Sequence, residues 1–169
     1  SMHGRNLLSL SRPAKPEMKI LSIENVLEET TETMVVCGIL KRFTILREYT
    51  ADLPSILGDK NLLEQLIRNL EINAAHAMGD EGTLTVGTRL SKDKRFGEFY
   101  IRDTGHGMSE ETKEKIFEPF FTTKSDGKGT GLGMHIVKQI VEQHKGYIRI
   151  ESQPAKGTTM IIGIPAKRD

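Results

Sequence analysis

Glycines gather in two short clusters in the second half of this 169-residue chain. The first cluster holds Gly105 and Gly107, and the second occupies every other position of segment 127–133. Because glycine is required where φ is positive or where the backbone must approach a ligand closely, each cluster predicts a close approach to a bound molecule. The segment between the clusters contains half of the phenylalanines: Phe117, Phe120 and Phe121. The sequence therefore favours a fold in which two approach sites flank an aromatic loop.

Length and charge narrow the class of protein. A chain of 169 residues is long enough to bury one core, and we expect a single domain. The 24 basic and 23 acidic side chains are interspersed and give a net charge of +1, so we expect no nucleic-acid partner. Cys37 is the single cysteine and no apolar run is long enough for a membrane span. We therefore expect a cytoplasmic segment, whose longer parent protein can still be attached to a membrane.

Apolar periodicity predicts alternating helices and hairpins. We expect helices over residues 22–40, 59–78, 109–116 and 132–144, with Asp59 and Ser109 as N-caps and Gly79 ending the second helix. We expect strands over residues 43–49, 83–90, 98–102, 147–152 and 158–164. This order predicts an α/β (α+β) two-layer sandwich, in which three main helices cover a mixed, largely antiparallel sheet of about five strands.

Three polar side chains lie together on the helix expected over 59–78. Asn69, Asn73 and His76 follow one another at i, i+4 and i+7, on the boundary between a leucine-rich face and a charged face. We expect Glu71 to lie on the charged face, with Glu64 and Arg68. Amide oxygens suit Mg²⁺, which binds through few protein ligands plus substrate phosphates. The helix taken alone is equally compatible with solvated asparagines on a surface.

Each glycine cluster has its own context. Asp103 ends a strand, and Gly105 and Gly107 let the chain turn tightly after it, although a simple structural turn also explains this pattern. The second cluster opens a helix, which directs backbone N–H groups at an anion and predicts a phosphate site. It lacks the Gly-Lys-Ser/Thr ending of a P-loop and does not follow the first strand of a parallel βαβ unit.

Four motifs in order resemble the N, G1, F and G2 boxes of the ATP-binding domain of bacterial sensor histidine kinases, in the GHKL superfamily. The motifs are Asn69 with Asn73-Ala-x-x-Ala, residues 103–108, residues 117–124 (Phe-Glu-Pro-Phe-Phe-Thr-Thr-Lys) and residues 129–133. The match covers about residues 57–165. Four ordered boxes are specific where any single one is not. The resemblance implies a Bergerat-type fold with a mobile ATP lid from Met108 to Thr130.

The resemblance also implies roles for single residues. Asn73 would hold Mg²⁺ against the ATP phosphates with help from Asn69, Asp103 would accept the adenine 6-amino group, and Lys124 would contact phosphate. The catalytic residues would be Asn69, Asn73 and Lys124. Thr158 would reach adenine through water, and His76 either approaches ribose or phosphate or is an exposed helix histidine. The expected nucleotide contacts are Asn69, Asn73, His76, Ala77, Asp103, Gly105, Gly107, Met108, Lys124, Gly129, Thr130, Gly131, Leu132, Gly133 and Thr158.

One position separates the chemistries of the superfamily. Related ATPases and the anti-sigma-factor serine kinases carry a glutamate general base four residues before the magnesium asparagine, where this chain has Asn69. An amide cannot take a proton, whereas an imidazole acceptor attacks phosphorus without first losing one. The resemblance therefore favours a protein-histidine kinase, with a nucleotide-binding regulatory module as the main alternative and an ATPase clamp or serine kinase as weaker ones.

The phosphoacceptor histidine is not found in the sequence, since none of the five histidines lies in a His-Glu-[Ile/Leu]-[Arg/Lys]-x-Pro motif. We expect residues 1–2 to be a tag remnant, residues 3–20 the tail of a dimerisation helix with a linker, and residues 21–169 the ATP-binding catalytic domain. The implied partners are the histidine-containing dimerisation domain of the same kinase and a response regulator receiver domain. We expect this chain to be monomeric and the full-length protein to be a homodimer.

Overall fold

The structure is a computed structural model and describes residues 15–119, 121 and 133–167. Its main sheet has five strands in the order β2-β4-β5-β7-β6. β2 is parallel to β4, and the other three pairings are antiparallel. The mixed sheet predicted from the sequence is therefore confirmed. Its strands are β2 (Thr44–Glu48), β4 (Thr83–Leu90), β5 (Phe96–Asp103), β6 (Tyr147–Ser152) and β7 (Thr158–Pro165).

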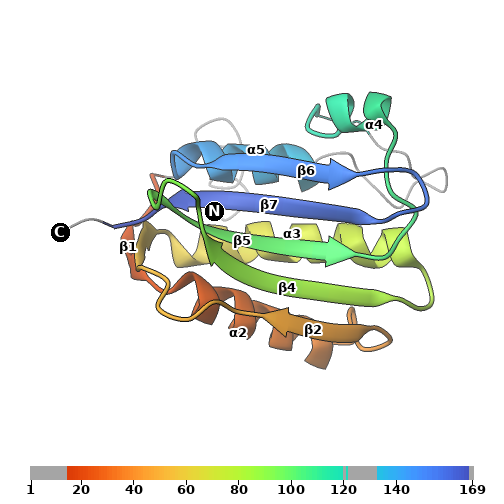
Figure 1. Ribbon diagram of the computed structural model, residues 1–169, viewed down its shortest axis with the longest axis horizontal. Helices are drawn as coiled ribbons and strands as arrows, with labels where there is room; N and C mark the ends of the chain where they lie inside the picture. Colours follow the sequence, from red (N-terminus) through yellow and green to blue (C-terminus); the bar gives the residue numbers. More distant parts are fainter. Residues whose placement is uncertain (1–14, 120, 122–132, 168–169) are drawn as a thin grey trace, which may run out of the picture.

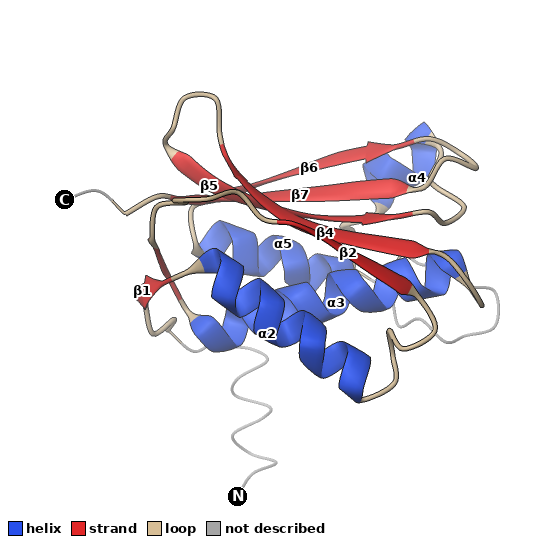
Figure 2. Ribbon diagram, turned by 60° about the horizontal axis from the view of Figure 1, so that its bottom comes forward, coloured by secondary structure: helices blue, strands red, loops and turns tan. Residues whose placement is uncertain are grey.

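Three long helices lie together on one face of the sheet, so the molecule has two layers (Figures 1 and 2). The central helix α3 packs against both of the others. A short helix, α4, lies beside the end of β6 (Figure 1). The helices are α2 (Ile23–Val36), α3 (Lys60–Met78), α4 (Glu110–Lys115) and α5 (Gly133–Gln143).

Side-chain caps set the helix starts. The Asp59 carboxylate accepts from the Leu62 N–H at 3.0 Å, and the Ser109 hydroxyl accepts from the Thr112 N–H at 3.2 Å, as the sequence predicts. Gly79 ends α3 with φ +76°. The α2 helix is shorter than expected, because Gly38 (φ +99°) turns the chain just after it.

A second, two-stranded sheet was not predicted. β1 (Lys19–Leu21) pairs antiparallel with β3 (Ile56–Gly58) just before α3 begins. Three-residue strands carry too little alternation to be recognised in a sequence. This small sheet ties the beginning of the described chain to the start of the central helix.

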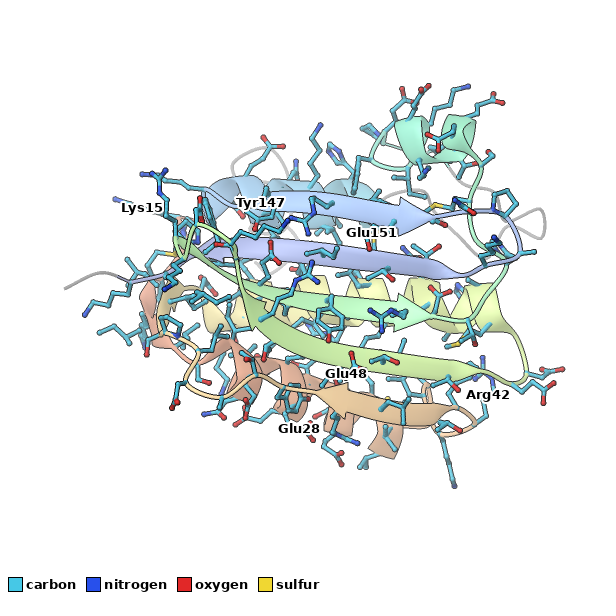
Figure 3. All side chains as sticks on the ribbon, in the orientation of Figure 1. Lys15, Glu28, Arg42, Glu48, Tyr147 and Glu151 are labelled. Atoms are coloured by element: carbon cyan, nitrogen blue, oxygen red, sulfur yellow. The ribbon has the colours of Figure 1, made fainter. Side chains whose placement is uncertain are left out.

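The hydrophobic core fills the space between the sheet and the helices. Its fully buried side chains come from both layers: Leu27, Met34, Leu63, Leu66, Ile67, Leu84, Phe99, Ile162 and Ile164. The other sheet face is polar, and Figure 3 shows Glu48, Tyr147 and Glu151 on it. In the described part of the chain, no helix is long and apolar enough to cross a bilayer.

Candidate nucleotide-binding site

Two of the predicted motifs, the asparagine motif that ends at Ala77 and residues 103–108, meet at one end of the two-layer sandwich. β5 and β6 end there, β7 and α5 begin there, and α3 runs toward it (Figure 1). Hydrogen bonds connect these ends: the His106 N–H donates to the Ala77 carbonyl at 3.2 Å, and the Ala155 N–H donates to the His106 carbonyl at 2.6 Å. The loop after β5 is thereby fixed between the end of α3 and the β6–β7 turn.

Asp103 is the last residue of β5 and is only 7% exposed. Its Oδ1 accepts a hydrogen bond from the Gly105 N–H at 2.8 Å. Burial raises the pKa of the Asp103 carboxyl above its usual range, against the lowering effect of hydrogen bonds from the Gly105 and Thr158 backbone and of nearby His106. A carboxylate held in this way can accept a hydrogen bond from a ligand in a largely dry environment.

The two glycines of the loop are required by close backbone packing. At Gly105, a Cβ would lie 2.6 Å from the carbonyl carbon of Ala77, inside contact distance. Gly107 has φ +71°, and a Cβ there would collide with the carbonyl oxygen of Gln153. The first cluster thus brings the loop against protein backbone on two sides, which differs from the approach to a ligand that the sequence alone suggested.

Asn69 joins α3 to the start of α5. Its side-chain Nδ2 donates to the Gly133 carbonyl at 3.3 Å, and Gly133 is the first residue of α5. Because the nitrogen makes this bond, the amide oxygen is the atom left for a cation or a water. Asn73, one turn further along α3, is half-buried, as Asn69 is. The helix edge with asparagines therefore lies next to the N-terminus of α5.

This donor set fits a magnesium ion. The described residues contain no group of three or more His, Cys, Asp or Glu side chains able to hold a metal. Neutral amide oxygens at a helix edge match an ion that keeps several waters and takes its remaining ligands from phosphates. When bound, Mg²⁺ neutralises charge on the phosphate oxygens. Asn73, with Asn69 beside it, would hold it.

Other predicted residues lie around the same end of the fold. The Met108 N–H donates to the Ser152 hydroxyl at 2.8 Å. Thr158 faces Asp103 across the β5–β7 pair and is 8% exposed. His76 is exposed on α3. The predicted contacts outside the described residues are Lys124, Gly129, Thr130, Gly131 and Leu132.

Sequence reasoning missed Ser152. This residue ends β6 and its hydroxyl lies 2.7 Å from the Thr158 Oγ1. A serine at the end of a strand carries no motif, and only the β6–β7 register, in which Ser152 faces Thr158, shows its neighbours.

A family model described as histidine kinase-, DNA gyrase B- and HSP90-like ATPase matches residues 58–168, and the chain belongs to this family. Sensor histidine kinase ZraS of Klebsiella oxytoca is 36% identical over 159 residues, which cover 94% of this chain and 34% of ZraS. Within the family, the chain is the ATP-binding catalytic domain of a histidine kinase.

Solved structures share the architecture. The mycobacterial sensor histidine kinase MprB superposes with a TM-score of 0.77 at 25% identity, covering 90% of this chain and all of that one. The full-length ShkA complex with AMPPNP has a TM-score of 0.80 at 24% identity, covers 99% of this chain and 37% of ShkA, and shows the common fold. The chain spans about a third of the length of ZraS.

Proposed function

We propose that this chain binds Mg-ATP and donates the γ-phosphoryl group to a histidine on a separate dimerisation domain. In the parent protein, the group would then pass to an aspartate of a response regulator receiver domain. Residues 3–20 would link the dimerisation helix to the catalytic domain of residues 21–169. The parent protein would act as a homodimer, and this chain alone as a monomer.

The observation that carries the proposal is the buried Asp103 carboxylate at the end of the sandwich where β5 ends. A carboxylate that is only 7% exposed can pair only with hydrogen-bond donors, as it does with the Gly105 N–H, and it has the capacity to accept a further donor from a ligand. The 6-amino group of adenine is such a donor, whereas guanine has a carbonyl at the same position. A guanine nucleotide would bring two acceptors together, so ATP should bind much more tightly than GTP.

The triphosphate would extend from the purine toward α3 and α5. The N-terminus of α5 adjoins Asn69 and carries the positive end of the helix dipole. Asn73 would hold the magnesium ion, and Lys124 with Gly129, Thr130, Gly131, Leu132 and Gly133 would contact phosphates. ShkA, which shares the fold, was solved with the ATP analogue AMPPNP.

The residue at position 69 supports transfer to histidine. An asparagine amide cannot remove a proton from water or from a serine hydroxyl, so it provides no general base for hydrolysis or serine phosphorylation. A neutral imidazole already has a lone pair for attack on phosphorus. Asn69 can therefore orient a ligand or water while the acceptor itself supplies the nucleophile.

Transfer is tested by mixing this chain with the histidine-bearing domain of its parent protein and radiolabelled ATP. We expect acid-labile, base-stable phosphate on the added domain and no appreciable label on this chain alone. A matched variant of the added domain, with its phosphoacceptor histidine replaced by glutamine, should remain unlabelled. Tight ATP binding without any transfer would contradict the kinase proposal and favour a regulatory module.

A further inference from the structure

The Ser152 hydroxyl makes three short polar contacts at the end of β6. It lies 2.8 Å from the Met108 backbone nitrogen, 3.0 Å from the Gly157 carbonyl oxygen and 2.7 Å from the Thr158 Oγ1. Ser152 and Thr158 face each other in the β6–β7 register. Directly opposed residues on neighbouring strands point to the same side of a sheet, here the side that carries the core residue Met160.

The directions of these hydrogen bonds follow from the number of protons. A serine hydroxyl has one proton to donate and two lone pairs that accept. The Met108 N–H occupies one lone pair, and the Gly157 carbonyl, which can only accept, takes the serine proton. The contact with Thr158 must then run from the Thr158 hydroxyl to the second lone pair of Ser152.

This arrangement decides what Thr158 can offer a ligand. With its only proton directed at Ser152, the Thr158 hydroxyl presents lone pairs to every other neighbour. Thr158 lies opposite Asp103 in the β5–β7 register, and the two residues are 8% and 7% exposed. On neighbouring strands and on the same side of the sheet, the Asp103 carboxylate and the Thr158 hydroxyl then offer only hydrogen-bond acceptors.

We propose that Ser152 is a specificity-determining positioning residue: it fixes the Thr158 proton, so that the site accepts an amino-bearing purine and rejects a keto-bearing one. The inference rests on the proposed ATP binding and extends it to a residue that does not touch the nucleotide. A ligand or bridging water that donates finds two acceptors. A purine carbonyl finds no donor at this position, which is the unfavourable pairing that gives strong discrimination.

Removal of the Ser152 hydroxyl should relax this discrimination. In Ser152→Ala the Thr158 proton loses its acceptor and can rotate toward the ligand, where it can serve a keto group. The probe is the ratio of affinities for ATP and inosine triphosphate, which carries a keto group where ATP carries the amino group. We expect the ratio to fall by roughly tenfold, the effect of one hydrogen bond. Ser152→Thr keeps a hydroxyl and should restore most of the wild-type ratio.

Two further variants separate proton positioning from structural damage. Thr159→Val removes the neighbouring hydroxyl, which accepts from Arg102 Nε at 3.3 Å on the polar sheet face, and should leave the ratio unchanged. Thr158→Val should lower the ratio by itself, and adding Ser152→Ala to it should cause no further fall, because the two residues act as one unit.

The inference fails if Ser152→Ala keeps the wild-type ratio of ATP to inosine triphosphate affinity while circular dichroism shows that the variant is folded. It fails equally if Ser152→Ala lowers the ratio further in a chain that already carries Thr158→Val. This comparison of Thr158→Val with the double variant does not need the Ser152→Ala single variant to be stable. These outcomes differ from failure of the proposed function, in which the wild-type chain binds neither nucleotide.

Discussion

Thr31 of α2 donates its hydroxyl proton to Glu71 of α3 at 2.8 Å, and both residues are fully buried. The second oxygen of Glu71, Oε1, has no hydrogen-bond partner among the described residues. Burial raises the pKa of Glu71 from 4.5 to about 7, against the lowering effect of the Thr31 hydrogen bond. A carboxyl whose pKa lies near neutral pH therefore lies between the two helices, two residues before Asn73.

This raised pKa predicts a loss of stability with increasing pH. Between pH 4.5 and about 7 the folded state binds the proton more tightly than the unfolded state, so the unfolding free energy falls as pH rises through this window. The loss is on the order of 3 kcal/mol by pH 8. Glu71→Gln, which stays neutral, should remove this component and be more stable than the wild type at pH 8.

Urea denaturation at pH 5 and pH 8 measures the effect. Glu142→Gln, at an exposed position on α5, is the matched control and should leave the pH dependence as it is. If the difference in stability between wild type and Glu71→Gln is the same at both pH values, Glu71 is already ionised in the folded protein at pH 5.

Gly107→Ala should destabilise the loop after β5. Its φ of +71° is unfavourable for alanine, and the added methyl would collide with the Gln153 carbonyl oxygen. Strain of this kind costs about 1 to 3 kcal/mol. Gly38→Ala is the matched control, because Gly38 also has positive φ (+99°) but an added Cβ there meets nothing within 4 Å. Thermal unfolding should show a larger loss of stability for Gly107→Ala than for Gly38→Ala. Equal losses would show that the collision with the Gln153 carbonyl adds nothing to the strain of a positive φ.

Asn73→Ala should abolish binding of Mg-ATP, since the amide oxygen is the proposed protein ligand of the ion. Any residual ATP affinity of the variant should be the same with and without Mg²⁺. Asn61→Ala, an exposed asparagine in the first turn of the same helix, should behave as wild type. A Mg²⁺-dependent gain in ATP affinity that persists in Asn73→Ala would show that residues other than Asn73 hold the ion.

Much of the fold could be predicted, because long helices and strands carry strong periodicity. The β4 and β6 ranges are confirmed residue for residue, as are the N-caps Asp59 and Ser109. The prediction for Glu71 was wrong. A helical wheel separates one apolar face from one charged face, but α3 packs against α2 and α5 as well as lying under the sheet, so the Glu71 side is buried too.

In the site, as in the fold, features with a local sequence pattern could be predicted and features that depend on packing could not. Asp103, Gly105 and Gly107 are recognisable because each has a local pattern, and the structure brings their loop to the end of α3 near Ala77. Ser152 has no local pattern, because its contacts to Met108 and Thr158 depend on strand register and loop path. The helix over 59–78 gave the order of the asparagines but not the bond from Asn69 to Gly133, which depends on how two helices pack.

A calorimetric titration of the wild-type chain and of Asp103→Ala, with ATP and then GTP in the presence of Mg²⁺, tests ATP recognition most directly. We expect one ATP site per chain, much weaker binding of GTP, and a loss of about 1 to 3 kcal/mol of ATP affinity in Asp103→Ala. Equal affinity for the two nucleotides, or unchanged ATP affinity without the Asp103 carboxylate, would contradict recognition of the purine by this residue.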